Sequence, residues 1–187
     1  FGIWEREVYT ATRHLLKGCQ SAVDVGACAG EYTLLCLRQP SMRRVIAVEP
    51  YPPNLDRLHA NLELNHLRDD PRLDIRTEFL GHSSKPGTTT LDDLGIPEGT
   101  PLFIKIDVDG GELDVLRGGP KLLARSNVSL LVETHSVELE KTCIEFLAAA
   151  GYDCRIIPNA WWRRFIPEDR PIGQNRWFAA IRPRGAA

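Results

Sequence analysis

Short apolar runs alternate along this chain with stretches in which apolar residues recur every three or four positions. The second pattern begins near the N-terminus, where Trp4, Val8, Ala11 and Leu15 predict an amphipathic helix within residues 1–18. The apolar runs have strand length and predict strands at residues 22–25, 45–48, 73–75, 102–106 and 128–132. Helical spacing follows four of these runs and predicts helices at residues 32–37, 52–65, 111–123 and 137–150. Strands that alternate with helices in this way form a mostly parallel central sheet with helices on both faces.

The last two apolar runs, at residues 154–157 and 177–181, have no helical pattern between them. We therefore expect an antiparallel terminal strand pair at one edge of the sheet. The fold class that follows is α/β and Rossmann-like. At 187 residues the chain is long enough for one substantial core, so we expect a single domain over residues 1–187.

Charge and composition narrow the class of partner. The formal net charge is -2, so nothing in the balance predicts binding to nucleic acid. No apolar run approaches the length of a membrane span, and no signal peptide is visible. The five cysteines form no Cys-x-x-Cys pair, which favours reduced thiols in a cytoplasmic protein over a zinc site. No pattern indicates the oligomeric state.

The segment AVDVGACAGEYTLL, residues 22–35, joins a predicted strand to a predicted helix through a loop of small residues. Such a loop suits a nucleotide-like ligand at a helix N-terminus. Its spacing, from Asp24 through Gly26 to Gly30, is Asp-x-Gly-x-x-x-Gly and lacks two of the three glycines of a dinucleotide fingerprint. An acid in that place can receive a cationic amine or hold the loop, which favours S-adenosylmethionine over a pyrophosphate. The alternative is an ordinary strand-to-helix turn in which the glycines serve geometry alone.

Acidic residues stand at or near the carboxyl ends of four predicted strands. They are Asp24, Glu49, Asp107 and Glu133. In open α/β sheets, ligands bind at that edge. Glu49 lies one strand-helix-strand step beyond the glycine loop, where a carboxylate can take both ribose hydroxyls of a nucleoside. Each acid alone could be a helix N-cap or a surface residue, but the combined pattern favours a ligand site.

Several segments of the chain resemble the FkbM-type S-adenosylmethionine-dependent methyltransferases, which have the class I methyltransferase fold. These segments are GIWEREV, VDVGACAGEYTLL, VIAVEPYPPNLDRLHANLELN, TTTLDDL, FIKIDVDGGELDVLRGG, LLVETHS and WFAAIRP. Together they extend over nearly the whole chain, and the block from Lys105 to Glu112 is the most distinctive of them. The resemblance implies a Rossmann-like class I methyltransferase and an S-adenosylmethionine-dependent O-methyltransferase activity.

The resemblance also implies the roles of residues at the methyl-donor site. The loop residues that wrap the methionine part of S-adenosylmethionine are Gly26, Ala27, Cys28 and Gly30. Asp24 supports that loop or the donor's amino group. Glu49 takes the ribose, and Pro50 and Tyr51 flank the adenine. Asp107 faces the methyl group that is transferred.

The chain departs from the family pattern in three places. Cys28 stands where the family usually has Asn, as an apolar filler or a sign of weaker donor binding, and Asp109 stands where it usually has Glu. The segment 74–90 is shorter than the family's third strand, adenine-contacting segment and hairpin together. We interpret this as a deletion, or as residues missing from the sequence, with seams near Arg76 and Lys85.

The chemistry of methyl transfer identifies candidate catalytic residues. A sugar or alkyl hydroxyl is a poor nucleophile at neutral pH, so it needs a base worth about 10²–10⁴ in rate, or a metal that acidifies it. His135 is the expected base, because it follows the fifth predicted strand and lies beside the expected position of the methyl group. An alternative uses Asp107, Glu133 and His135 together as ligands of Mg²⁺ or another divalent ion.

The acceptor site is expected in a loop at residues 158–176. Trp161 and Trp162 can stack on a sugar ring, and Arg163 can hold a phosphate or carboxylate. The alternative is that one tryptophan packs under the terminal strands while the arginine is solvated. We expect a small-molecule acceptor, such as a sugar, a polyketide or a lipid-linked glycan, with S-adenosylhomocysteine as the second product.

Two other functions stay open at this point. The chain could be a non-catalytic binding module on the same fold, which the acids at Asp24, Glu49 and Asp107 disfavour. It could also be a nicotinamide-dependent oxidoreductase, which the glycine spacing disfavours.

Overall fold

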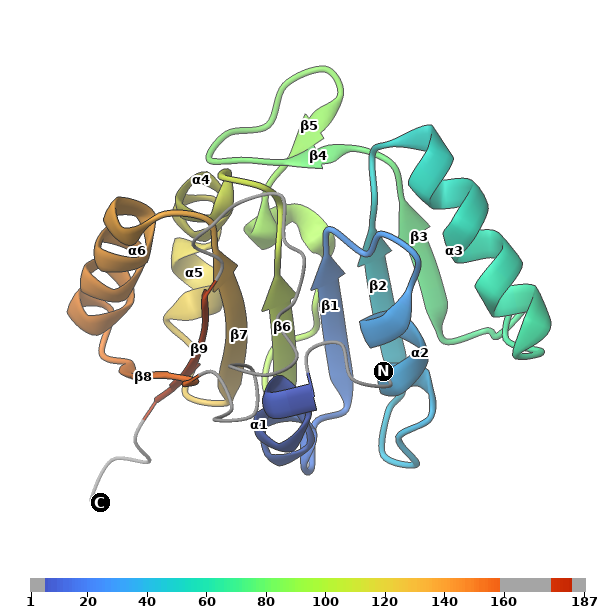
Figure 1. Ribbon diagram of the computed structural model, residues 1–187, viewed down its shortest axis with the longest axis horizontal. Coiled ribbons are helices and arrows are strands. Elements are labelled where there is room, and N and C mark those ends of the chain that lie inside the picture. Colours follow the sequence, from blue (N-terminus) through green and yellow to red (C-terminus); the bar gives the residue numbers. More distant parts are fainter. Residues whose placement is uncertain (1–5, 159–175, 183–187) are drawn as a thin grey trace, which may run out of the picture.

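The computed structural model describes residues 6–158 and 176–182 and places seven strands in one central sheet (Figure 1). In chain order these strands are β1 (Ser21–Val25), β2 (Arg44–Val48), β3 (Leu73–Arg76), β6 (Leu102–Ile106), β7 (Val128–Thr134), β8 (Asp153–Ile156) and β9 (Arg176–Ile181). They lie in the order β3-β2-β1-β6-β7-β9-β8. The first five of these in sheet order run parallel, while β9 is antiparallel to both β7 and β8. The predicted parallel sheet with an antiparallel terminal pair is confirmed.

The register of the parallel strands brings their carboxyl ends level. Val25, the last residue of β1, pairs with Val48 of β2 on one side and with Ile106 of β6 on the other. The strand order also reverses here, because the chain leaves β1 toward β2 and later returns to its other side as β6. A reversal of this kind opens a crevice at the carboxyl ends of the strands, where ligands bind in α/β sheets.

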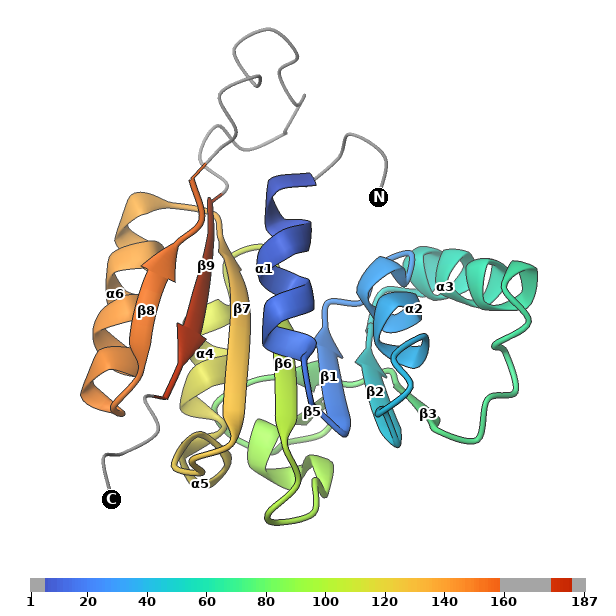
Figure 2. The same ribbon diagram turned by 90° about the horizontal axis from the view of Figure 1, so that it is seen from below.

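Helices cover both faces of the sheet (Figure 2). The group of helices on one face contains α1 (Arg6–Leu16), α2 (Glu31–Leu37) and α3 (Pro52–Leu64), and the second group lies on the other face. The second contains the short 3₁₀ helix η1 (Leu91–Leu94), α4 (Glu112–Arg117), α5 (Pro120–Leu123) and α6 (Val137–Ala149). Side chains of one strand alternate between these groups, since Phe103 of β6 packs with the first and Ile104 with the second. The central strands are buried on both faces, which explains why their sequences are mostly apolar.

Local signals explain where the helices begin and end. The backbone N–H of Leu139 donates to the Ser136 side chain at 3.1 Å, which caps the first turn of α6. α3 begins at Pro52, a residue suited to the first helical position. Gly118 and Gly119 separate α4 from α5, so the helix predicted at residues 111–123 is two short helices. A Cβ at Gly118 would lie 2.1 Å from the carbonyl oxygen of Gly81, so a larger residue cannot fit there.

The shortened segment 74–90 forms structure that the sequence pattern did not predict. It contains β4 (Phe79–Leu80) and β5 (Thr88–Thr89), which pair in parallel above the carboxyl ends of the sheet (Figure 1). The two predicted seams lie near Arg76 and Lys85. Arg76 is the last residue of β3, and Lys85 forms an isolated β-bridge with Thr88, the first residue of β5. Strands of two residues are too short to leave a period in the sequence.

The described residues include no helix that is long and apolar enough to cross a bilayer.

Candidate active site

The glycine loop after β1 is held by the neighbouring strand. The backbone N–H groups of Gly26 and Ala27 both donate to the carbonyl oxygen of Val48, at 2.9 and 3.0 Å. Gly26 has φ +73°, and a Cβ added to it would lie 1.8 Å from the carbonyl oxygen of Asp107. Gly30 has φ +89°, and its Cβ would lie 2.4 Å from Leu58 Cδ1 in α3. Both glycines are therefore required by backbone conformation and by close approach.

Glu49 ties the glycine loop to the start of α3. Its Oε2 accepts a hydrogen bond from the backbone N–H of Cys28 at 2.8 Å, and its Oε1 accepts one from the N–H of Tyr51 at 2.9 Å. The Glu49 side chain is buried, whereas Tyr51 is 59 % exposed. Each carboxylate oxygen has a second lone pair, so Glu49 can still accept hydroxyl groups of a ligand.

Cys28 adopts a backbone conformation that is uncommon for its residue type. Its φ is +48°, in the left-handed region where Asn is tolerated better than most side chains. The side chain is exposed, and its N–H is the donor to Glu49. Backbone conformation therefore gives a physical reason for the Asn that the family usually has at this position.

A buried ion pair lies beneath the loop. Asp24 is 1 % exposed and accepts a hydrogen bond from the Thr33 hydroxyl at 2.6 Å. Its other oxygen lies 3.4 Å from Nζ of Lys105. Burial raises the pKa of Asp24, and the charge of Lys105 opposes that rise. The structure thus places Asp24 against α2 and Lys105.

Lys105 joins the glycine loop to Asp107. Its Nζ donates to the carbonyl oxygen of Gly26 at 2.6 Å and lies 3.4 Å from Asp107 Oδ2. The Lys105 side chain is 3 % exposed and also lies over the Tyr32 ring, 5.4 Å from its centroid. Sequence reasoning gave Lys105 no role. The signal was present, since a lysine within the otherwise apolar strand LFIKI requires a buried partner.

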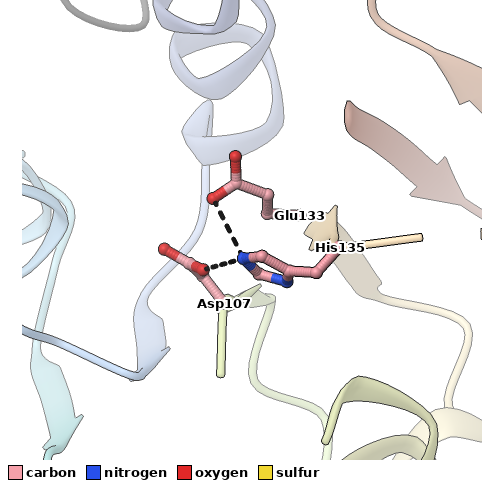
Figure 3. A group of neighbouring side chains, drawn as sticks. All are labelled: Asp107, Glu133 and His135. Carbon is pink, nitrogen blue, oxygen red and sulfur yellow. Dashed lines mark ion pairs between the residues drawn. The ribbon is translucent and has the colours of Figure 1, made fainter. Parts of the chain in front are cut away.

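His135 lies at the centre of the acidic group that follows β6 and β7 (Figure 3). Its Nε2 lies 3.6 Å from Asp107 Oδ1 and 4.0 Å from Glu133 Oε2. The exposed carboxylate of Asp109 approaches the same nitrogen to 3.3 Å. The structure therefore brings Asp107, Glu133 and His135 together, as their positions after neighbouring strands predicted.

The other ring nitrogen of His135 is bound to Glu112. His135 Nδ1 lies 2.9 Å from Glu112 Oε1, and the Glu112 side chain is completely buried. Burial alone lowers the pKa of His135, but the hydrogen bond to Glu112 and the surrounding carboxylates outweigh burial and raise this pKa. Glu112 was quoted in the distinctive block but not assigned to the site.

The same three residues form a candidate set of metal ligands. One ligand atom each from Asp107, Glu133 and His135 lies within 4.8 Å of the other two. Two carboxylates and one imidazole suit several divalent ions. This is the one group of its kind within residues 6–158 and 176–182.

The predicted acceptor loop lies outside the described residues. This applies to Trp161, Trp162 and Arg163, and their roles stay predictions. The roles assigned to the donor-site residues also stay predictions, although the structure gathers those residues along one edge of the sheet.

Comparison with known proteins matches part of the chain to a family model. Residues 70–154 match the methyltransferase FkbM domain family. That range contains every residue of the acidic group around His135. No curated protein sequence matches the chain.

Solved structures share the fold. A methyltransferase FkbM from Methylobacillus flagellatus KT superposes with a TM-score of 0.69 at 19 % identity, over 88 % of this chain and 44 % of that one. The chain thus spans less than half the length of that protein. A precorrin-6y C5,15-methyltransferase from Geobacter metallireducens GS-15 gives a TM-score of 0.65 at 18 % identity, over 97 % and 90 % of the two chains. An rRNA methylase from Streptococcus thermophilus gives 0.63 at 12 % identity, over 97 % and 99 %.

The names of two of these proteins indicate different acceptors, a precorrin and an rRNA. The shared fold therefore does not specify the acceptor atom. Residues 70–154 thus match the methyltransferase FkbM domain, and the described residues have the Rossmann-like fold that these methyltransferase structures share.

Proposed function

We propose that this protein is an S-adenosylmethionine-dependent O-methyltransferase that acts on a hydroxyl group of a sugar or another small natural-product acceptor. One observation carries the proposal. The Lys105 ammonium contacts the carbonyl of Gly26 in the glycine loop and the carboxylate of Asp107 at the acidic edge. In this proposal, the site for the methyl donor and the site for hydroxyl activation form one connected unit.

The donor side fits S-adenosylmethionine, whose use the methyltransferase family implies. The glycine loop leaves no room for side chains at Gly26 and Gly30 and presents its backbone at the end of β1. Glu49 would accept the ribose hydroxyls with its remaining lone pairs, and Tyr51 with Pro50 would flank the adenine. When bound, S-adenosylmethionine supplies an electrophilic methyl group on a sulfonium.

Asp24 supports the loop in this proposal and does not meet the donor's amino group. Its carboxylate is 1 % exposed and is already engaged by Thr33 and Lys105. Desolvation of a buried carboxylate costs roughly several kcal/mol unless the carboxylate is paired and hydrogen-bonded. The pairing with Lys105 meets that requirement and fixes the loop at the same time.

On the acceptor side, His135 would remove the proton from the hydroxyl. Its Nδ1 is engaged by Glu112, which leaves Nε2 facing Asp107. Nε2 would take the hydroxyl proton as the acceptor oxygen bonds to the methyl carbon, while the bond from that carbon to sulfur breaks and its electron pair leaves with S-adenosylhomocysteine. The resulting imidazolium is stabilised by Asp107 and Glu133, which lie 3.6 and 4.0 Å from that nitrogen.

A metal ion is the second way to activate the hydroxyl at the same place. The 3.6 Å between His135 Nε2 and Asp107 Oδ1 is close to the separation of two ligands that share one ion at roughly 2.0–2.2 Å. Asp107 would use Oδ1 for the ion, because Lys105 lies against Oδ2. Removal of metal separates this alternative from the base.

Calorimetry tests the donor proposal without knowledge of the acceptor. We expect S-adenosylmethionine and S-adenosylhomocysteine to bind and NAD not to bind. Binding of NAD alone would favour a nicotinamide-dependent oxidoreductase. Binding of none of the three would favour a non-catalytic module and overturn the proposal.

Transfer of a labelled methyl group tests the reaction class. The protein is incubated with methyl-labelled donor and a panel of sugars, polyketides, lipid-linked glycans and peptides, and the product is examined by NMR for the atom that carries the methyl group. We expect an O-methyl product. A product methylated on carbon or nitrogen would contradict the O-methyltransferase proposal and leave the donor site intact.

The proposal also includes a cellular location and a loop that contacts the acceptor. All five cysteines are free thiols, which fits the cytoplasmic location that we propose. The loop at residues 158–176 is proposed to contact the acceptor through Trp161, Trp162 and Arg163. Comparing the acceptor KM of Trp161→Ala and Trp162→Ala with their donor affinity checks this role, because an acceptor contact changes the KM alone.

A further inference from the structure

A buried carboxylate, that of Glu112, lies at the start of α4. Glu112 is completely buried, although it stands in the first turn of a short helix that follows an exposed loop. Its Oε2 has no hydrogen-bond partner among the described residues. Burying a carboxylate in this way is costly, so a specific contact must favour Glu112 at this position.

That contact is with His135. Glu112 Oε1 lies 2.9 Å from His135 Nδ1 and also accepts hydrogen bonds from the backbone N–H groups of Gly110 at 3.1 Å and Val108 at 3.4 Å. Val108 and Gly110 belong to the loop that begins at Asp107. One carboxylate oxygen therefore ties the end of β7 to the loop after β6.

We propose that Glu112 is a positioning residue, which holds neutral His135 in the Nδ1–H tautomer and directs the lone pair of Nε2 toward Asp107. This inference rests on the proposed role of His135 as the base. An ionised carboxylate can only accept hydrogen bonds, so Nδ1 must donate to it. The proton on Nδ1 leaves Nε2 as the acceptor, and the tautomer is thereby fixed.

The surrounding charges do not replace Glu112 in this role. Asp107, Asp109 and Glu133 all approach Nε2, where they favour a proton on that nitrogen and therefore the opposite tautomer. Among the described residues, Glu112 is the one carboxylate that forms an ion pair with Nδ1. The geometry thus sets one acid against three, and the 2.9 Å hydrogen bond decides the outcome in the proposal.

A purely structural role for Glu112 would be to hold the loop through Gly110. Glutamine can fulfil that role, because its carbonyl oxygen still accepts the backbone N–H groups. It cannot fulfil the positioning role equally well, because a neutral acceptor forms a hydrogen bond only about half as strong. Its NH₂ group can also donate to Nδ1 and so favour the other tautomer.

The test is the ¹⁵N NMR spectrum of histidine-labelled protein at a basic pH where the imidazoles are neutral. The exposed residues His14, His66 and His82 provide internal references. For wild-type His135 we expect the Nδ1–H tautomer. In Glu112→Gln we expect the ratio of Nε2–H to Nδ1–H to rise by about tenfold, from the difference between charged and neutral hydrogen bonds.

A matched control is Glu140→Gln. Glu140 is a buried acid of α6 whose carboxylate pairs with Arg176. We expect this variant to keep the wild-type His135 tautomer, so a change in both variants would indicate a general loss of packing and contradict the assignment.

Wild-type protein alone can overturn the proposal, even if Glu112→Gln does not fold. An Nε2–H tautomer for wild-type His135 would show that Nδ1 accepts and that Glu112 does not direct Nε2 as proposed. An unchanged tautomer in folded Glu112→Gln would also refute it. Failure to bind S-adenosylmethionine would instead refute the proposed function, and the two results are read from separate experiments.

Discussion

Gly26→Ala tests whether the glycine loop and the acidic edge are packed against each other as the structure shows. The added methyl group would lie 1.8 Å from the carbonyl oxygen of Asp107. The methyl group would be fixed to the backbone of the glycine loop, and the Asp107 carbonyl belongs to the backbone directly after β6. The backbone N–H of Asp107 donates to the carbonyl oxygen of Val25 at 3.1 Å, which holds Asp107 in place. Neither group can rotate away, so the loop and β6 must separate.

The expected loss in the free energy of unfolding of Gly26→Ala has two parts. Placing alanine at φ +73° costs about 1–2 kcal/mol, because the left-handed region is unfavourable for residues with a Cβ. Forcing a carbon atom into a packed position adds about 1–3 kcal/mol from displaced backbone. We therefore expect Gly26→Ala to lower the free energy of unfolding by about 2–5 kcal/mol in total.

Gly99→Ala separates the two parts. Gly99 also has φ +73°, but nothing lies within 4 Å of the Cβ that would be added. It therefore has the conformational cost of about 1–2 kcal/mol without the contact. Urea unfolding followed by circular dichroism gives both values, and calorimetry gives the donor affinity, which we expect to fall for Gly26→Ala alone. Equal destabilisation of the two variants would refute the close approach of the loop to Asp107.

Three further predictions concern charged groups and metal. Lys105→Met leaves buried Asp24 without its cation and should lower the free energy of unfolding by about 3–5 kcal/mol near neutral pH. Loss of Lys105 raises the Asp24 pKa further, so protonation should reduce this deficit as pH falls, and a deficit that stays constant on acidification in urea unfolding would contradict the pairing. Glu49→Gln should weaken S-adenosylmethionine binding by about tenfold in calorimetry, because one acceptor oxygen is lost, while the exposed Glu63→Gln should bind as wild type. Exhaustive chelation should leave methyl transfer unchanged if His135 acts as the base, and a loss that Mg²⁺ restores would establish the metal alternative.

Much of the fold could be predicted because its signals are local. The buried strands β1, β2, β6 and β7 are mostly apolar, and the helices between them carry apolar residues at helical spacing. The meeting of Asp107, Glu133 and His135 also follows from topology, since all three lie at the carboxyl ends of two neighbouring parallel strands. Their closeness requires only that β6 and β7 be paired in register.

The remaining parts of the site depend on directions that a sequence does not encode locally. Whether Lys105 reaches solvent or the carbonyl of Gly26 depends on the rotation of a side chain about a strand and on the position of the loop above it. Glu112 reaches His135 because α4 starts at a particular angle after Gly110 and Gly111. The short strands β4 and β5 exist through pairing with each other, and neither has enough residues for a recognisable period.

The position of Lys105 has a consequence for how changes at this edge combine. Its single ammonium group contacts Asp24, the carbonyl of Gly26 and Asp107 within 3.4 Å. Substitutions at residues that share a partner are not additive, and coupling energies of about 0.5–3 kcal/mol are typical. A second change at Asp24 or Asp107 should therefore cost less in a Lys105→Met background than in wild type. Amino-acid substitutions at Asp24, Lys105 and Asp107 are therefore constrained together, because the effect of each depends on which residues occupy the other two positions.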